Sequence, residues 1–478
     1  MSYLSGIDRN QNTLVTASLD DVIDENNPVR VVDAFINAIN LKQLGFKEYE
    51  GNNRGQHPYK RSELLKLHMY GYLNGIRSSR KLEIESKRNL EVMWLINSIS
   101  PDHGTISLFM KENKDAFRKI LKEFTLILKG WGMIDDKLIA LDGTKLRAQN
   151  SNHNCITESK LNKKLEYVEE QIDSYINQLE NNYKCKDASI SLNAKEIREK
   201  INTYTEMKEE YEKQKNELSE KGLEQISLID EDSRRMKNNG KLEVCYNVQS
   251  VVDSKNCFVV DCDVVNDIND LNQLSQMALK AKKLLNKRKM IVVADTGYYN
   301  AEEIKKCVDK KLILLIKKSR LNNQTGKNEF RKDKFKYIEG QDIYLCPENQ
   351  ILSFSEYTTK NKVKYKRYKC KSCDQCLKRN HCTTSKDGRN IQRWINEEIL
   401  ESVAYNTYKN NEIYKKRRSI VEHPFGTIKR TMGYTYFLRK GLDSVNAEAA
   451  SIFVAYNLKR LLGKLTVPKI IEKFSQLS

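Results

Sequence analysis

The sequence contains no long apolar run. Nowhere do 18 apolar residues follow one another, so it predicts no membrane-spanning helix. Its first residues, MSYLSGIDRNQ, show no charged stretch followed by an apolar one, so we expect no signal peptide and a cytoplasmic protein. Acidic residues are also in short supply, since 64 Asp and Glu face 83 Lys and Arg and leave a net charge of +19. This charge indicates a polyanionic partner, most often nucleic acid, with a generic basic surface as the alternative.

Helical patterns fill the first part of the 478-residue chain, whose length suits two or three domains. Apolar residues recur at helical spacing from Leu64 to Leu73, and the basic turn GIRSSR follows at 75–80. SPDHGTISLF then opens another amphipathic segment. Residues 1–130 therefore predict a helical N-terminal domain. Helices joined by basic turns suit a DNA-binding helix-turn-helix, but they also suit any small helical bundle.

Strand patterns dominate the next part. KLIALDGTKLRA predicts a buried strand that ends at Asp142, and MIVVADTGYYN predicts another that ends at Asp295. Between them, LEVCYNVQSVVDSKN and CFVVDCDVVND predict two strands joined by a turn, and a helix with Asp270 as its N-cap follows. The helix AEEIKKCVDKK and the strand LILLIKKS come next. Together these elements predict a mixed α/β sheet.

The stretch from 158 to 224 is polar with a helical apolar spacing, and it predicts an antiparallel helical hairpin inserted into this domain. No residues with evident chemistry occur in it. We expect a structural or partner-binding role for the hairpin.

Asp142 and Asp295 share a context, because each follows an apolar strand and precedes a turn. Acids at such positions either cap the turn or act at the sheet edge. Glu422, in RRSIVEHPFGTIKR, is a third candidate, although it could simply pair with its basic neighbours. Three carboxylates can hold two Mg²⁺ ions, or Mn²⁺ in experiments, for an in-line displacement at phosphorus.

On a continuous helix, Tyr414, Arg418, Glu422 and Lys429 would share one face, so that the basic residues hold a DNA strand beside the ions. Pro424 predicts a kink or a helix start near Glu422.

Five cysteines fall between Cys346 and Cys382, and clustered thiols in a reducing compartment indicate a metal site rather than disulfides. The Cys-x2-Cys step from Cys373 to Cys376 fits two thiolates on one structural Zn²⁺. Free cysteines in a loop are the alternative. Eleven Lys and Arg against two Asp across 360–390 predict a surface that contacts phosphates.

Taken together, these stretches resemble the DDE transposases of bacterial insertion sequences, in the branch whose third carboxylate lies in a Tyr-Arg-Glu-Lys signature. The resemblance rests on LDGTKLRA, CYNVQSVVD, VVADTGYYN and EHPFGTIKR, with YGYLNGIRSSRKLE and SPDHGTISLF near the start. Arg418, Glu422 and Lys429 keep the signature's spacings of three and six intervening residues, while Tyr414 lies one residue too far from Arg418. Only the hairpin at 158–224 lacks a specific match.

The resemblance implies an RNase H-like mixed sheet with flanking helices at 131–478, with Asp142, Asp295 and Glu422 as catalytic Mg²⁺ ligands. It implies DNA contacts from Tyr414, Arg418 and Lys429. His423 would be either a further DNA contact or an ordinary packed histidine.

The cysteine cluster is similar to a small cysteine-rich insertion of related transposases, placed here at 340–385. That similarity favours four zinc ligands, with Cys370 or His381 as possible substitutes. The favoured ligands are Cys346, Cys373, Cys376 and Cys382.

The predicted function is that of a DNA transposase. It would bind the terminal inverted repeats of its insertion sequence, cut there, and join the ends to target DNA. The resemblance further implies a homodimer on paired ends. Two alternatives stay open at this point: an RNase H-like nuclease without strand transfer, and a DNA-binding remnant without catalysis.

Overall fold

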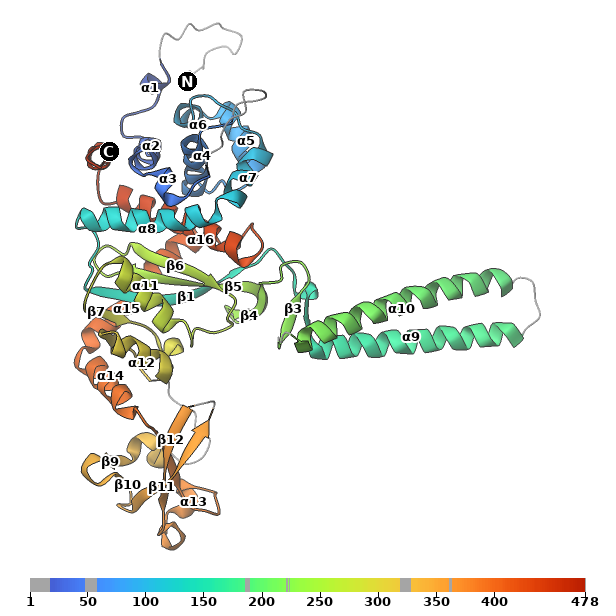
Figure 1. Cartoon of the computed structure of the whole chain (residues 1–478), viewed down its shortest axis with the longest axis vertical. Helices are drawn as coiled ribbons and strands as arrows, with labels where there is room; N and C mark the ends of the chain where they lie inside the picture. Colours follow the sequence, from blue (N-terminus) through green and yellow to red (C-terminus); the bar gives the residue numbers. More distant parts are fainter. Residues whose placement is uncertain are drawn as a thin grey trace, which may run out of the picture.

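The computed structural model describes residues 18–47, 58–184, 190–220, 222, 224–318, 328–360 and 363–477. A helical region lies at one end of the molecule, a mixed sheet at its centre and a smaller sheet at the other end, while a pair of long helices projects sideways (Figure 1). The predicted link between those two helices, CKDASISLN, spans 185–193; its residues 185–189 lie outside the described residues, and the second helix already begins at Ile190.

The central sheet confirms the predicted mixed α/β architecture. β5 pairs antiparallel with β1, β4 and β6, and β7 and β8 continue the sheet parallel to β1 on its other side. The strands are β1 (Leu138–Arg147), β4 (Arg234–Asn238), β5 (Lys241–Asp253), β6 (Val259–Val265), β7 (Met290–Val293) and β8 (Leu312–Leu315). β5 and β6 are apolar over most of their length and are buried on both faces, whereas β4, with the sequence RRMKN, buries only Met236.

Helices cover the sheet, and α16 is the most buried of them. Its residues from Val445 to Leu458 are all buried, because it packs against β6, α8 and α4 at once. The helices that follow or flank the sheet are α11 (Leu274–Leu284), α12 (Ala301–Asp309), α14 (Glu397–Lys409), α15 (Asn411–Gly426) and α16 (Leu442–Leu462).

The N-terminal region is helical as predicted, and the C-terminal helix packs onto it. Rings from three parts of the chain meet there, since Phe35 lies 4.6 Å from Phe124 and 5.6 Å from Phe474 between ring centroids. The helical region and the sheet therefore share one hydrophobic core. Its helices are α1 (Leu19–Val22), α2 (Val29–Ala38), α3 (Leu41–Leu44), α4 (Arg61–Leu73), α5 (Ser79–Arg88), α6 (Leu90–Leu95), α7 (His103–Glu112), α8 (Lys114–Gly130) and α17 (Val467–Ser475).

The side arm consists of α9 (Glu158–Lys184) and α10 (Ile190–Glu220), which pack along each other. The short strands β2 (Cys155–Thr157) and β3 (Gln225–Ser227) pair at its base. This arm is the helical hairpin that the sequence predicts at 158–224. Neither its helices nor any other helix of the described residues is long and apolar enough to cross a membrane.

The smaller sheet has its own core of aromatic and cysteine side chains. Its antiparallel order is β13-β12-β11-β10-β9. The strands are β9 (Lys336–Ile338), β10 (Ile343–Leu345), β11 (Ile351–Lys360), β12 (Val363–Cys370) and β13 (Asn390–Trp394), with the one-turn helix α13 (Arg379–Cys382) beside them.

Two local predictions were wrong. β1 does not end at Asp142 but continues to Arg147, because the residues after Asp142 keep pairing with β5. Asp270 does not cap α11, which begins at Leu274 and follows Gln273. Of the two alternatives for Pro424, the helix start is wrong, because Pro424 lies inside α15 (Asn411–Gly426), which continues into the π-helical segment η7 (Thr427–Thr431); the kink stays a prediction.

Candidate active site

Asp142 and Asp295 lie at the same edge of the central sheet. β1 and β7 run parallel with Ala140 opposite Val293, and each aspartate follows two residues later on its own chain. The structure therefore brings these two predicted residues together. Asp295 also accepts a hydrogen bond from the backbone N–H of Gly297 at 2.8 Å, so the capping role given as the alternative holds for it as well.

The environment of Asp142 disfavours its charged form. Burial raises the pKa of this carboxyl from 3.8 to about 7; the Arg417 guanidinium, 3.7 Å away, opposes the rise, and the charge of Asp295 adds to it. A divalent cation between the two aspartates would relieve this repulsion. Two carboxylates that leave coordination positions for water and phosphate oxygens suit Mg²⁺.

Glu422 does not join the two aspartates in this structure. Its carboxylate accepts a hydrogen bond from Nε of Arg418 at 2.7 Å, and both side chains are exposed. The structure therefore shows the alternative given for Glu422, an i,i+4 ion pair with a basic neighbour. Among the described residues, no three His, Cys, Asp or Glu side chains form a group that could hold a metal ion.

The basic residues of α15 and η7 differ from the predicted arrangement. Arg417, rather than Arg418, faces Asp142. Lys429 does not share a face with Arg418 and Glu422: its ammonium donates to Oγ1 of Thr144 at 2.6 Å and to a carbonyl of β1. The π-helical turn after Pro424 separates the two stretches, so the four residues do not follow one helical spacing.

Tyr414 lies beside the site, and His423 lies away from it. The charges of Asp295 and Arg417 both act on the Tyr414 hydroxyl, whose pKa is raised chiefly by burial. His423 uses both ring nitrogens inside the protein, since Nδ1 lies 2.8 Å from the Tyr456 hydroxyl and Nε2 lies 2.8 Å from a guanidinium nitrogen of Arg460. It is the packed histidine of the two alternatives, and its prediction as a DNA contact is corrected accordingly.

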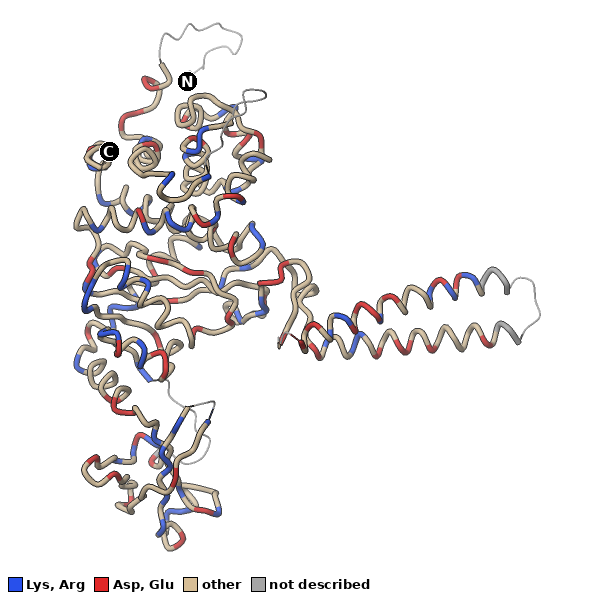
Figure 2. The backbone as a smooth tube through the Cα atoms, in the orientation of Figure 1, with Lys and Arg blue, Asp and Glu red and all other residues tan. Residues whose placement is uncertain are grey.

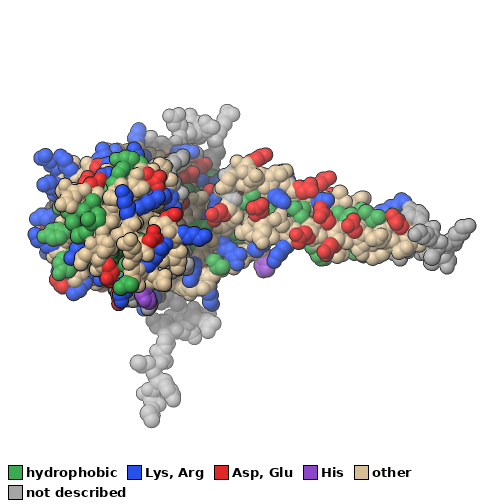
Figure 3. All heavy atoms as spheres, turned by 90° about the horizontal axis from the view of Figure 1, so that it is seen from below, with side chains coloured by type: hydrophobic (Ala, Val, Ile, Leu, Met, Phe, Trp, Pro, Cys, Tyr) green, Lys and Arg blue, Asp and Glu red, His purple; other side chains and the backbone are tan. Residues whose placement is uncertain are grey.

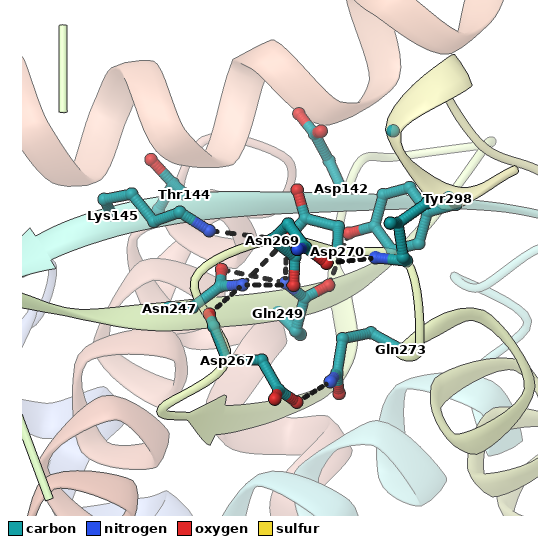
Figure 4. Close-up of polar contacts among 12 residues, drawn as sticks. Asp142, Thr144, Lys145, Asn247, Gln249, Asp267, Asn269, Asp270, Gln273 and Tyr298 are labelled. Carbon is teal, nitrogen blue, oxygen red and sulfur yellow. Dashed lines mark hydrogen bonds and ion pairs between the residues drawn. The ribbon is translucent and has the colours of Figure 1, made fainter. Parts of the chain in front are cut away.

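A polar network that the sequence did not predict surrounds Asp270, in the loop before α11 (Figure 4). Three donors reach the same oxygen of Asp270, Oδ1. They are Nε2 of Gln249 at 2.7 Å, Nδ2 of Asn247 at 2.8 Å and Nζ of Lys145 at 3.5 Å. The buried Tyr298 hydroxyl donates to the other end of Gln249. Two amides inside the otherwise apolar strand CYNVQSVV were the signal that could have revealed this network.

The five clustered cysteines lie in or beside the smaller sheet, and in the described part of the chain they form no group of three that could hold a metal ion. Cys370 ends β12, Cys346 follows β10, and Cys382 ends α13. The pKa of Cys373 is raised to about 11, chiefly by burial, and neighbouring thiols add to the rise. Gly388 has a positive φ of +74°, and a Cβ there would lie 2.9 Å from Cβ of Cys373, so glycine permits this close packing.

The raised pKa of Asp142 predicts how the metal-free protein responds to pH. Between pH 4 and 7 the folded chain keeps a proton on Asp142 that the unfolded chain has released, so stability falls as pH rises. We expect this single group to account for a loss of about 2–3 kcal/mol between pH 5 and pH 8. Urea unfolding in EDTA should show a flatter pH dependence for Asp142→Asn than for the wild type. Equal slopes for the two proteins would contradict the assigned pKa.

Two segments of the chain match models of transposase domains. Residues 345–462 match the model of a transposase DDE domain, and residues 17–112 match the model of a transposase domain of otherwise unassigned role, DUF772. The first match includes Glu422 and the cysteine cluster, whereas Asp142 and Asp295 precede it. No curated protein matches the chain.

One solved structure is similar, the cryo-EM structure of a piggyBac transposase synaptic complex with hairpin DNA. It is 8% identical over 95% of this chain and 80% of that chain, with a TM-score of 0.29, a value too low to carry an argument.

A mixed sheet with two acids at one edge is an arrangement that can hold divalent metal ions for phosphoryl transfer. The match over residues 345–462 is more specific: this part of the chain is similar to a transposase DDE domain, which implies metal-dependent phosphoryl transfer on DNA.

Proposed function

We propose that the chain binds the terminal inverted repeats of its own insertion sequence, cleaves the DNA there and transfers the ends to target DNA. One observation carries the proposal: Asp142 and Asp295 lie side by side on parallel strands, with the pKa of Asp142 raised. Bound Mg²⁺, with Mn²⁺ as a substitute, would activate the attacking hydroxyl or water and stabilise the leaving oxygen. Asp142 and Asp295 would hold the ions, and Arg417 would contact the scissile phosphate in place of Asp142.

Glu422 stays the proposed third ligand. Its partner Arg418 is exposed, and an exposed i,i+4 pair contributes only about 0.2–0.5 kcal/mol. Arg418 can therefore exchange Glu422 for a DNA phosphate at little cost, which frees Glu422 to turn toward the sheet. Lys429, tied to β1 beside Asp142, would then orient this edge rather than hold the strand by itself.

The distribution of charge supports DNA binding by the part of the molecule outside the helical arm, which we call the body. The arm at 158–220 carries fifteen acidic and eleven basic residues, so the whole excess of +19 belongs to the rest of the chain. Acidic and basic residues both occur along the arm in Figure 2, and Figure 3 shows many Lys and Arg side chains, with some acidic ones, on the face of the molecule outside the arm. We propose that paired ends are held by a homodimer in the cytoplasm, with duplex DNA on the body.

The test is an assay of cleavage and joining on a labelled duplex that carries the element's own terminal repeat, with Mg²⁺. Nicks at the repeat end together with joined products support the transposase. Nicks without joined products favour an RNase H-like nuclease. Repeat binding without nicks in either Mg²⁺ or Mn²⁺ contradicts the proposal.

Replacing Glu422 by glutamine should lower cleavage at least about 100-fold and leave DNA binding within about twofold, because the exposed side chain supports no packing. Glu412→Gln is the matched control on the same helix, since Glu412 is also exposed and pairs with Lys415. It should cleave like the wild type. Full cleavage by Glu422→Gln, or lost binding with intact cleavage, would remove Glu422 from the metal site.

The cysteine cluster is proposed to hold one structural Zn²⁺. The thiols of Cys346, Cys376 and Cys370 each add to the raised pKa of the Cys382 thiol, and this electrostatic effect supports the proposal. A closed sulfur site would stabilise the smaller sheet and would leave no position open for substrate.

Cys373→Ser should lower zinc content from about one ion per chain to near zero and make residues 340–385 sensitive to protease. Metal analysis and mass spectrometry of the intact protein measure the zinc content, and the masses of the fragments after protease treatment show whether 340–385 is cut. Cys370→Ser is the informative companion: retained zinc makes Cys370 the spare thiol, whereas lost zinc makes it a ligand. Unchanged zinc in Cys373→Ser would contradict the site.

A further inference from the structure

We propose that the amino-terminal edge of the central sheet binds a second segment of duplex DNA through its phosphates. This inference rests on the proposed function, which places the repeat DNA at the other edge, beside Asp142 and Asp295. Five exposed basic residues form the new surface, which we call the basic edge: Lys137, Arg288, Lys289, Lys310 and Lys311.

The fold brings the basic edge together from three parts of the chain. Its residues come directly before three strands: Lys137 before β1, Arg288 and Lys289 before β7, and Lys310 and Lys311 before β8. β7 pairs in parallel with both β1 and β8, so the amino-terminal ends of the three strands meet at one edge. Neighbouring strands lie about 4.8 Å apart, so the five charges form a short row. β1 runs toward the arm, and the basic edge therefore lies on the side of the sheet away from the arm (Figure 1).

The charges of the basic edge are not neutralised within the fold. In the part of the chain that the structure describes, none of its five side chains makes an ion pair or a hydrogen bond. The acids next to it already have partners: Asp135 accepts from Ser254, Asp136 pairs with Lys287 and Asp309 pairs with Lys305. Like charges held side by side repel one another, so the basic edge favours an anionic partner from outside the chain.

Stabilisation of helix ends explains only some of the lysines in this region. A cation near the C-terminus of a helix is favourable, and Lys282, in the last turn of α11, donates to the carbonyl of Lys310. Arg288 and Lys289 lie beyond the last turn of α11, which ends at Leu284. Their charges are therefore not required for the helix, and Lys137 follows no helix directly.

Lys311 has a backbone conformation that does not favour lysine. Its φ is +61°, in the left-handed region, at the position after the C-cap of α12. Glycine or asparagine is usual there, because a longer side chain gains nothing from this conformation and its Cβ makes it unfavourable. Asn286 occupies the corresponding position after α11, with φ +47°. The backbone thus gives no reason for a lysine at 311, whereas a phosphate partner does.

Duplex DNA matches the basic edge in charge and in repeat. Its phosphates recur about every 3.4 Å of helix axis along each strand, so a row of cations can meet several phosphates at once. Cations that contact phosphates hold a duplex without reading its sequence. Asp142 lies five residues beyond Lys137, roughly 17 Å along an extended strand, so the DNA segment here is not the one at the acids. A duplex to which the cut ends are joined fits this description.

Acetylation of lysines, read by mass spectrometry, tests where the second duplex lies. The full chain is first saturated with a short duplex that carries only the terminal repeat, and an unrelated duplex is then added. We expect Lys289, Lys310 and Lys311 to stay reactive with the repeat alone. The unrelated duplex should make them at least about fivefold less reactive. Lys213, exposed on the arm, is the internal reference and should stay reactive throughout.

A double variant tests whether these charges bind the duplex. Lys289→Gln combined with Lys311→Gly should weaken binding of the unrelated duplex about tenfold or more at about 0.1 M salt. It should also reduce the slope of log K against log salt concentration by about two. Glycine relieves the left-handed backbone at 311, so the urea midpoint of unfolding should not fall, and lost binding is then not a result of unfolding.

Lys237→Gln combined with Lys241→Gln is the matched control. It removes the same charge from the hairpin between β4 and β5, at the other end of the same sheet, where both lysines are exposed. Its affinity for the unrelated duplex should stay within about twofold of the wild type. Equal losses in the two double variants would show that only net charge matters, and they would overturn the basic edge as a site.

The other outcomes separate this inference from the proposed function. Lysines that stay reactive with the unrelated duplex, or that the repeat duplex alone already protects, overturn the second segment. Protection by polyglutamate but not by the duplex would assign the surface to an acidic protein instead and overturn it as well. Protected lysines in a wild type that makes no nicks at the repeat would overturn cleavage at Asp142 and Asp295 and leave the basic edge standing.

Discussion

Asp142→Asn is expected to abolish cleavage and joining of the terminal repeat, a loss of roughly a thousandfold or more, while repeat binding stays within about twofold. The asparagine amide cannot share a cation with Asp295, although it fills the same space on β1. The Asp142 carboxylate pairs with Arg417, and β1 is held to β5 and β7 by backbone pairing, so the strand is expected to persist.

The same substitution should make the metal-free protein more stable at pH 8. Above pH 7 the wild type must keep a buried negative charge next to Asp295, and asparagine removes that cost. Replacing a functional carboxylate should lower activity and raise stability, whereas replacing a structural carboxylate should lower both. Asp309→Asn, at an exposed pair with Lys305, is the control that should change neither. Cleavage by Asp142→Asn near the wild-type rate would contradict the assignment of the site.

Much of the fold could be predicted from local sequence, because its strands are apolar runs of ordinary length. The two aspartates at strand ends were also predictable, since a strand and a turn are both local patterns. The face of α15 that packs on β1 was not. Arg417 and Arg418 are neighbours with the same chemistry, and only the burial of Val421 against the sheet decides which one reaches Asp142.

Asp270 could not be predicted for a related reason. An acid shortly before an apolar helical pattern fits an N-cap. Whether Asp270 caps the helix or joins the polar network instead depends on where β5 presents Asn247 and Gln249. The position of these two amides is set by the pairing of Gly143 in β1 with Gln249 in β5, which are more than a hundred residues apart in the sequence. Local patterns contain no information on such contacts.

The basic turn GIRSSR illustrates the same limit, because its two arginines have opposite environments. Arg77 is buried against the C-terminal part of the chain, with its guanidinium 4.8 Å from the ring of Tyr434 and 4.7 Å from the ring of Tyr436. It donates to the Tyr436 carbonyl at 2.6 Å and lies 3.2 Å from Oε1 of Glu448. Arg80, three residues on, is exposed. The turn thus contributes one residue to an internal clamp and leaves the other available for DNA.

Glu448 makes Arg77 important for stability. Its side chain is 1% exposed on the buried helix α16, and burial raises its pKa. Backbone N–H groups of Leu438 and Arg439 donate to it, but Arg77 is the cation that faces it at ion-pair distance. Removing one partner of such a pair leaves an uncompensated buried charge, which costs about 3–5 kcal/mol.

We therefore expect Arg77→Ala to lower the free energy of unfolding by about 3–5 kcal/mol at pH 8 in urea titrations. The loss should decrease as the pH is lowered from 8 to 5, because burial raises the pKa of Glu448 and protonation removes its uncompensated charge. Arg80→Ala should stay within about 0.5 kcal/mol of the wild type at both pH values. Arg77→Lys should lie between them, since lysine keeps the charge but loses the planar stacking on the two tyrosines.

A double-mutant cycle with Glu448→Gln separates charge from packing. If the charge pair dominates, the glutamine background should reduce the cost of Arg77→Ala to the lost stacking and the lost bond to the Tyr436 carbonyl, about 1–2 kcal/mol. An undiminished cost in that background would show that the two tyrosine rings, rather than Glu448, are the reason Arg77 is buried. Equal losses in the free energy of unfolding for Arg77→Ala and Arg80→Ala would instead mean that the contacts of Arg77 with Tyr434, Tyr436 and Glu448 do not stabilise the fold.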